Sequence, residues 1–316
     1  MILFIIPVTM PENNNWLGWA DFPPSILNGG SHFSNLSTDD WKDATLWIKE
    51  NTADDAVIAS WWDYGYWITT LSDRTTLADN ATLIDWQIKK IGFTLITNPE
   101  NSWNILSSDY TEDISLYLGD ENVLAFGGQL ESDFNQEYLD NHGVPCEQIF
   151  KSEAQNLNVG EQSCNPITKG MDADYIVIYL AGERFYIQDS NIPLYTLESG
   201  GDESKKTWYV AISNHEISKY IQNDNITPTD YFMENSTLGQ LIPFSIFKYV
   251  EPNTGRTFDQ YENGLIPVYV NDLKLNDSES DPFYLVYASP SFYSQQSGPM
   301  STVLIYKINH DYIPQN

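Results

Sequence analysis

The sequence predicts a mixed α/β core domain followed by a small β-rich domain, from three observations. Apolar runs at residues 56–59 and 174–180 have the length and composition of buried strands. Residues 83–97 place apolar side chains at a helical spacing between these runs. After residue 229 the chain changes to short, tyrosine-rich segments of β type that are separated by glycine and proline.

Composition limits the possible functions. The chain has 316 residues, enough for one large domain or two modest ones. Its 20 Tyr, 14 Phe and 10 Trp supply apolar area for a core and argue against global disorder. The chain has 15 Lys and Arg and 44 Asp and Glu, which gives a net charge of −29. Such a field repels nucleic acid, so we expect no nucleic-acid partner and a solvated acidic surface.

The N-terminal segment predicts a membrane anchor. Residues 1–8 are apolar but too short to span a bilayer, which takes about 20 residues. They lack the basic region and cleavage site of a signal peptide. We interpret residues 1–10 as the outer end of a transmembrane helix, and residues 11–30, rich in turn-forming residues, as a linker. An apolar strand or an artefact of the start site is the alternative.

The core domain is expected at residues 31–229. Its first helix follows a cap at Ser37 or Thr38 and ends at Asn51. The helix at residues 83–97 is stopped by Asn-Pro, and a further helix is expected from residue 200 to 221. The β-rich domain is expected at residues 230–316, with strands at 242–250, 265–270, 283–288 and 303–308.

A cluster of aromatic residues follows the first predicted strand: Trp61, Trp62, Asp63, Tyr64 and Gly65. Two adjacent tryptophans at a strand end can build a small pocket. Indole N–H groups only donate hydrogen bonds and an ionised aspartate only accepts them, whereas a Ser or Thr hydroxyl does both. Such a pocket would hold a hydroxyl and leave its own polar groups unpaired against Ala. The alternative is a core tryptophan pair, with Asp63 capping the following helix.

The cluster resembles the WWDYG signature of oligosaccharyltransferase catalytic subunits. The flanking residues 59–60 and 66–68, the stretch Asp73–Asn80 and the strand at 174–177 are also similar to that family. The resemblance is specific over residues 37–82 and weaker to about residue 222. It implies that the five residues of the cluster bind an acceptor polypeptide through its Asn-X-Ser/Thr sequon.

A second family signature has the form Asp-x-x-Lys-x-x-x-Met or Ile on a helix. Asp202 and Lys205 match its first half, and the resemblance implies that they join the acceptor-peptide site. Tyr209 stands where the family has Met or Ile, so the match is incomplete. An ordinary pair at positions i and i+3 of a helix start is the alternative.

The resemblance implies part of a glycosyltransferase that transfers a dolichol-linked oligosaccharide to asparagine at the extracytoplasmic face of the cell membrane. In the family, the catalytic carboxylates, a divalent metal (Mn or Mg) and the lipid-linked oligosaccharide belong to the transmembrane part. That part is absent from this sequence, so we assign no catalytic residue, metal ligand or cofactor here. The acidic composition suggests an archaeal source from salty water.

Two other classes of protein remain as rivals. The first is a stand-alone, surface-exposed binding or structural protein without transferase activity. The second is a soluble hydrolase built on the acidic residues, which ranks last because no nucleophile elbow or paired-carboxylate spacing occurs.

Two kinds of covalent modification are expected outside the cell. Cys146 and Cys164 would form one disulfide in an oxidising compartment, with two buried free thiols as the alternative. The sequence also contains five sequons, at Asn35, Asn80, Asn225, Asn235 and Asn276, which are candidate glycosylation sites.

Overall fold

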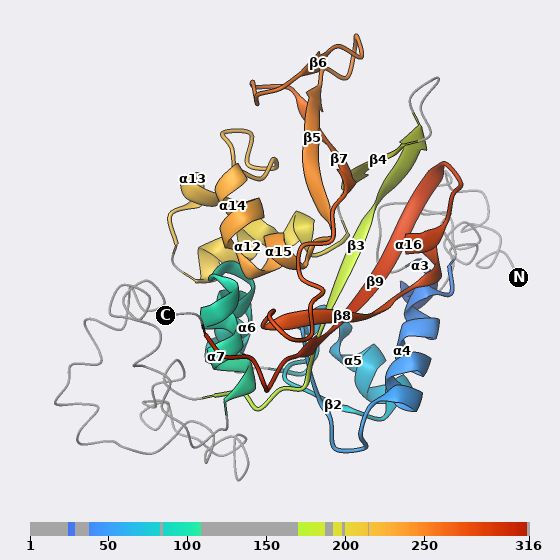
Figure 1. The fold of residues 1–316 in the computed structure, drawn as a ribbon, viewed down its shortest axis with the longest axis vertical. Coiled ribbons are helices and arrows are strands. Elements are labelled where there is room, and N and C mark those ends of the chain that lie inside the picture. Colours follow the sequence, from blue (N-terminus) through green and yellow to red (C-terminus); the bar gives the residue numbers. More distant parts are fainter. Residues whose placement is uncertain are drawn as a thin grey trace, which may run out of the picture.

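The computed structural model describes residues 25–28, 38–82, 85–108, 170–186, 192–197, 200–213 and 215–314. These residues form a mixed sheet with helices packed around it (Figure 1). The strands are β1 (Val57–Ser60), β2 (Thr75–Thr76), β3 (Tyr175–Tyr186), β4 (Pro193–Leu197), β5 (Phe244–Val250), β6 (Thr257–Phe258), β7 (Ile266–Asn271), β8 (Phe283–Ala288) and β9 (Gly298–Ile308).

The α-helices are mostly short. They are α3 (Ser25–Asn28), α4 (Asp40–Asn51), α5 (Gly65–Trp67), α6 (Asp85–Ile96), α7 (Pro99–Ser107), α12 (Lys206–Ile212), α13 (Ile217–Tyr220), α14 (Asp230–Asn235), α15 (Thr237–Leu241) and α16 (Pro290–Tyr293). Among the described residues, three further helical turns are η3 (Trp62–Tyr64), η4 (Ile68–Ser72) and η6 (Glu203–Lys205).

The sheet is built around β3. Its order is β2-β1-β3-β4-β7-β5-β6, and β9 pairs with both β3 and β8. The pairs β1–β2 and β1–β3 are parallel, whereas the pairs of β3 with β4 and β9 are antiparallel. The mixed α/β class predicted from the sequence is therefore confirmed.

The segment after residue 229 is rich in strands, as expected, but it belongs to the same sheet as the core. β9 pairs with β3 from Tyr175–Lys307 to Arg184–Gly298, and β7 joins β4 through Tyr195 and Tyr269. The expected boundary between residues 229 and 230 thus corresponds to no break in the sheet. The C-terminal strand β9 instead supplies the pairing partner for most of one edge of β3, from Tyr175 to Arg184.

The other edge of β3 contains a gap that positions the site. β1 ends where Ser60 pairs with Val177, and β4 begins its pairing at Gly182. Between them the turn at Gly201 approaches the strand closely. A Cβ atom on Gly201 would lie 2.7 Å from the backbone nitrogen of Ala181, closer than packing allows. Glycine at this position is therefore required for the chain to enter the gap.

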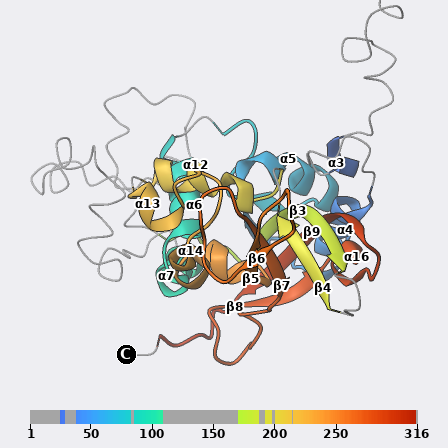
Figure 2. The ribbon, with the colours of Figure 1, turned by 90° about the horizontal axis from the view of Figure 1, so that it is seen from above.

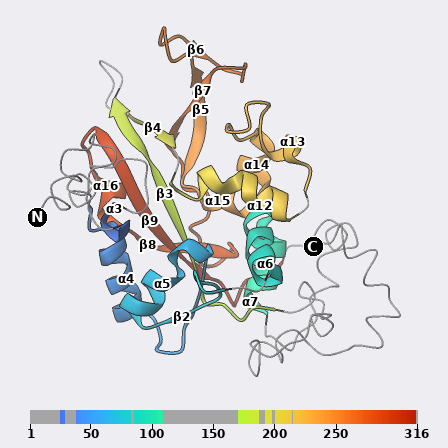
Figure 3. The ribbon, with the colours of Figure 1, turned by 180° about the vertical axis from the view of Figure 1, so that it is seen from behind.

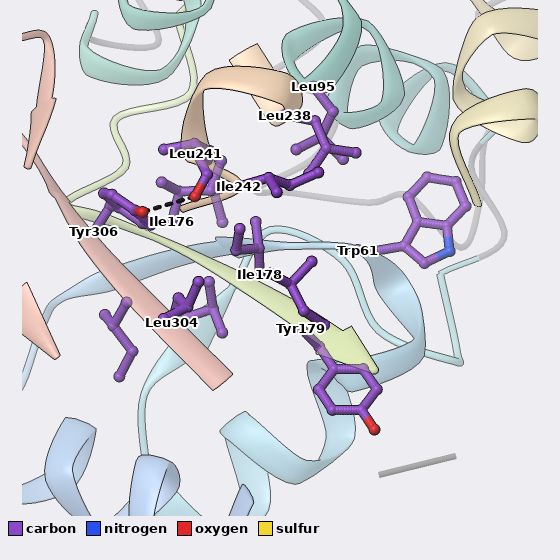
Figure 4. Close-up of a cluster of buried hydrophobic side chains, with 14 of the residues drawn as sticks. Trp61, Leu95, Ile176, Ile178, Tyr179, Leu238, Leu241, Ile242, Leu304 and Tyr306 are labelled. Atoms are coloured by element: carbon purple, nitrogen blue, oxygen red, sulfur yellow. Dashed lines mark hydrogen bonds between the residues drawn. The ribbon is translucent and has the colours of Figure 1, made fainter. Parts of the chain in front are cut away.

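Side chains of β3 point alternately to the two faces of the sheet, and both faces are packed. Ile176 and Ile178 face the side of α6 and α15, where Figure 4 shows them pointing toward Leu238 and Leu241. Tyr179 points the opposite way in the same view. From β9, the buried hydroxyl of Tyr306 donates to the carbonyl of Leu241 at 2.7 Å, and the dashed line marks this bond. Both faces of β3 are thus buried, as its nearly continuous apolar sequence predicts.

The predicted elements largely match the observed ones. The first helix ends at Asn51 as expected, and α6 stops before the Asn-Pro pair, where Asn98 caps α7 by accepting from the amide of Asn101 at 2.8 Å. One helix was expected from residue 200 to 221, and this prediction is wrong. In the described part of this range, η6 runs into α12, which ends at Ser213 with non-helical dihedral angles, and α13 is a separate helix.

The described part of the chain has no helix that is both long and apolar enough to cross a bilayer. The expected transmembrane end at residues 1–10 lies outside the described residues, as does most of the expected linker.

Arg74 joins the end of α4 to the chain before β2. Its buried guanidinium donates to the carbonyls of Lys49 and Thr52, both at 2.9 Å. It also donates to the hydroxyl of Thr52 and to the carbonyls of Ser72 and Asp73. Helix carbonyls that lack an intrahelical partner are thereby satisfied by a positive charge at the negative end of the helix.

We predict that Arg74→Met lowers the free energy of unfolding by about 2–4 kcal/mol, because several partly or fully buried hydrogen bonds to carbonyls lose their charged donor. Urea denaturation would measure the loss as a lower midpoint. Arg256→Met is the matched control: Arg256 is exposed, and its loss should cost no more than about 0.5 kcal/mol. Equal midpoints for the two variants would show that Arg74 does not hold this junction together.

Candidate functional site

The aromatic cluster of residues 61–65 starts where β1 stops. Trp61 follows Ser60 in an extended conformation, and the chain then turns into η3 and α5. Gly65 lies against the segment after β2, and a Cβ atom there would be 2.2 Å from the carbonyl oxygen of Ala78. The glycine therefore allows the helical turn to pack directly on the backbone that follows β2.

A buried carboxylate, that of Asp202, joins the cluster to β3. Its Oδ2 accepts from the backbone amide of Tyr179 at 2.8 Å, and its own amide donates to the carbonyl of Tyr179 at 2.7 Å. Its Oδ1 accepts from the hydroxyls of Tyr64 at 3.1 Å and Tyr209 at 2.8 Å. Asp202 is only 1% exposed and therefore fills the gap on β3 as a strand neighbour would.

Tyr209, which stands where the second family signature has Met or Ile, has a structural role in this chain. It is fully buried on α12, where its hydroxyl reaches Asp202 and its ring meets Trp61 edge-on, with centroids 4.7 Å apart. A Met or Ile at this position could not donate a hydrogen bond. In this chain, position 209 thus belongs to the buried network and not to the surface.

On the other side, Tyr64 packs into an aromatic group. Its ring lies 4.8 Å from that of Trp41 on α4 and 5.9 Å from that of Tyr179. Trp67 of α5 meets Trp41 edge-on at 5.1 Å. The tilted and edge-on arrangements are the favourable ones for aromatic pairs. These contacts fix α5 against α4 and hold the Tyr64 hydroxyl at Asp202.

Lys205 connects the buried network to the surface. Its Nζ lies 2.7 Å from Oδ2 of Asp63 and donates to the Tyr64 hydroxyl at 2.7 Å. The side chains of Lys205 and Asp63 are 19% and 33% exposed, and Trp62 beside them is half-buried. A cation and a carboxylate are therefore partly accessible together, next to the buried network.

Burial shifts the pKa values of the buried network of Asp202, Tyr64 and Tyr209. Desolvation raises the pKa of Asp202, opposed by the nearby Lys205 and by the three donors. Burial and the negative charge of Asp202 raise the pKa of Tyr64 and Tyr209 well above 10, so both remain hydroxyl donors at neutral pH. Because the pKa of Asp202 is raised on folding, its contribution to stability is fully present at low pH and is lost as pH rises through the folded-state pKa.

The structure brings all seven predicted acceptor-site residues together, although they differ in accessibility. Trp61, Tyr64, Gly65 and Asp202 are buried, whereas Trp62, Asp63 and Lys205 reach the surface. The two alternatives given for these residues, a helix cap by Asp63 and an ion pair of Asp202 with Lys205, are not what the structure shows. Asp63 does not cap the following helix but pairs with Lys205, and Lys205 forms its ion pair with Asp63 and not with Asp202.

Sequence reasoning missed Trp41, Tyr179 and the hydrogen bond of Tyr209. Trp41 lies in the first predicted helix, but nothing local in the sequence indicates which rings it contacts. Within the described segments, no three His, Cys, Asp or Glu side chains lie close enough to hold a metal ion.

The predicted modification sites are only partly described. Asn80, Asn225, Asn235 and Asn276 are exposed, and their glycosylation stays a prediction. Asn35, Cys146 and Cys164 lie outside the described residues.

We predict that Tyr209→Phe raises the pKa of Asp202 further, because one donor that favours its ionised form is lost while the ring contact with Trp61 remains. Stability should fall by about 1–3 kcal/mol. Carboxyl ¹³C NMR would follow the titration, with the signal assigned by its absence in Asp202→Asn. Tyr306→Phe, which removes another buried hydroxyl, is the control and should leave this pKa unchanged. An unchanged pKa in Tyr209→Phe would contradict the network.

Part of this region matches a known family. Residues 53–142 match the model of the STT3/PglB/AglB core domain. Among curated relatives, the chain is 31% identical over 128 residues to the dolichyl-diphosphooligosaccharide–protein glycosyltransferase subunit stt-3 of Caenorhabditis elegans, covering 40% of this chain and 16% of the relative. It is 38% identical over 87 residues to subunit STT3B of Arabidopsis thaliana, covering 27% and 12%.

Solved structures give weaker likenesses. The C-terminal globular domain of an oligosaccharyltransferase from Archaeoglobus fulgidus aligns with 74% of this chain and 98% of its own, at 14% identity and a TM-score of 0.29. The pglb C-terminal domain of C. jejuni aligns with 85% and 99%, at 13% identity and a TM-score of 0.31. Scores of this size carry no argument about the fold. The chain spans less than a fifth of the two relatives' length, and its residues 53–142 are similar to the STT3/PglB/AglB core domain.

Proposed function

We propose that this chain is the acceptor-recognition part of an oligosaccharyltransferase and binds polypeptides at an Asn-X-Ser/Thr sequon. The observation that carries the proposal is the accessible ion pair of Asp63 and Lys205, held above the buried Asp202 network. The similarity of residues 53–142 to the STT3/PglB/AglB core domain supports the same function.

The ion pair suits a hydroxyl because it offers both an acceptor and a donor. The ionised carboxylate of Asp63 has about four lone-pair sites and can accept from a hydroxyl while it pairs with Lys205. The ammonium of Lys205 has three protons, of which two point to Asp63 and Tyr64. The third is available for the hydroxyl oxygen. A Ser or Thr side chain satisfies the remaining lone pairs of Asp63 and the third proton of Lys205, whereas Ala would cover these atoms and give them no partner.

The buried residues have a positioning role in this proposal. Trp61 and Tyr209 fix α12, Tyr64 fixes α5, and Asp202 ties both to β3. Because these residues are buried, they do not meet the peptide themselves. They keep the distance between Asp63 and Lys205 constant, which lowers the entropy lost on binding.

In the complete enzyme, the recognised asparagine would receive an oligosaccharide from a dolichol-linked donor at the extracytoplasmic face of the membrane. The donor and a divalent metal, Mn or Mg, would be held by the transmembrane part. This chain contributes binding, since holding the sequon places the asparagine amide at the reacting centre.

We predict that Asp63→Ala weakens binding of an Asn-X-Thr peptide about 10- to 100-fold, because a charge-assisted hydrogen bond of about 1.5–3 kcal/mol is lost. The variant should also lose the preference for Asn-X-Thr over Asn-X-Ala, since the discriminating acceptor is gone. Isothermal titration of this chain with both peptides would measure the two effects.

Asp259→Ala is the matched control, because Asp259 is also an exposed aspartate that pairs with a lysine, Lys248, away from the site. It should bind both peptides as the unaltered chain does. A stand-alone binding or structural protein would show no preference for Thr over Ala in any variant. That result, or an Asp63→Ala variant that keeps the preference, would overturn the proposed function.

A further inference from the structure

Two exposed aromatic side chains flank the ion pair of Asp63 and Lys205. Tyr66 is 48% exposed and Trp208 is 69% exposed. Each lies three positions after one member of the pair, Tyr66 after Asp63 and Trp208 after Lys205. Aromatic side chains gain most from burial, so two of them left in water beside one accessible ion pair indicate a contact surface.

Helical spacing places Tyr66 and Trp208 on the same faces as Asp63 and Lys205. η3 runs directly into α5, and η6 runs directly into α12, with right-handed helical dihedral angles at the junctions. Helical residues three positions apart have Cβ atoms about 5–6 Å apart on one face. Helical side chains also lean toward the N-terminus, which here is the direction of Asp63 and of Lys205. Figures 2 and 3 show α5 and α12 on the same side of the molecule, in front of the sheet in Figure 3.

Neither aromatic residue belongs to the core. On α12, the inner positions are filled by the buried Tyr209 and Val210, which leaves Trp208 on the outer face. In the helical run of η3 and α5, Tyr64 and Gly65 are buried, whereas Tyr66 is exposed. The folded chain therefore gains little from either ring, and a substitution there should leave the fold intact.

We propose that Tyr66 and Trp208 are specificity-determining residues that contact the acceptor peptide next to its hydroxyl residue. This inference rests on the proposed function. An extended peptide advances about 3.3 Å per residue, and helical spacing puts the Cβ atoms of Tyr66 and Trp208 about 5–6 Å from those of Asp63 and Lys205. Each ring can therefore reach a residue one or two positions from the hydroxyl residue. The two positions nearest the hydroxyl residue are X of the sequon and the residue that follows Ser or Thr. The surface favours apolar and aromatic side chains at these two positions.

The test compares two peptides that share Asn and Thr, one with Leu and one with Gly at both neighbouring positions, each with a Thr→Ala counterpart. The unaltered chain should bind the Leu peptide more tightly. Tyr66→Ala and Trp208→Ala should each weaken binding of the Leu peptide about 3- to 10-fold and reduce its advantage over the Gly peptide. Both variants should keep the preference for Thr over Ala, which depends on Asp63.

Tyr293→Ala and Phe247→Ala are the controls, because these aromatic residues are 63% and 50% exposed elsewhere. They should bind all peptides as the unaltered chain does, with equal urea midpoints for all four variants. Should an alanine variant unfold, Tyr66→Gln and Trp208→Gln repeat the comparison. Unchanged binding of the Leu peptide by the folded site variants would overturn the inference while Asp63→Ala still tests the proposed function. No preference for Thr over Ala in the unaltered chain would overturn both.

Discussion

The arrangement of this site depends on one buried carboxylate. Asp202 has lost nearly all contact with water, and an isolated carboxylate in such a place would be strongly destabilising. It is retained because a backbone amide and two tyrosine hydroxyls donate to it and Lys205 lies nearby. Each of these partners belongs to a different element. A requirement to satisfy one charge therefore becomes a requirement that β3, the aromatic cluster and α12 hold one relative position.

The same constraint links the interior to the surface. Lys205 donates to the Tyr64 hydroxyl, which in turn donates to Asp202. The ammonium is therefore tied to the buried network while it also pairs with Asp63. A flexible lysine at a surface ordinarily loses much side-chain entropy when it forms an ion pair, which is why such pairs contribute little. Here that entropy has already been lost to the buried network. The partly exposed pair therefore has a fixed geometry at the surface.

The sequence predicted the elements better than their connections. The buried strand at β3, the helix α4 and the position of the aromatic cluster after β1 follow from apolar spacing and local residue types. The contact between Tyr64 and Asp202 joins residues 138 positions apart, and periodicity carries no information about such a pair. For the same reason, β9 was expected in a separate domain although it completes the edge of β3. Tyr209 looked like a defect in a motif, and only the fold shows that its hydroxyl serves the buried carboxylate.

The proposed function requires that the buried network hold Asp63 and Lys205 in place to recognise the hydroxyl of a sequon. The most direct measurement is a crystal structure of this chain with a bound Asn-X-Thr peptide. Our account predicts the threonine hydroxyl within about 3 Å of both the Asp63 carboxylate and the Lys205 ammonium, with the bonds to Asp202 intact. A peptide bound elsewhere, or one whose hydroxyl faces away from an undisturbed Asp63–Lys205 pair, would contradict it.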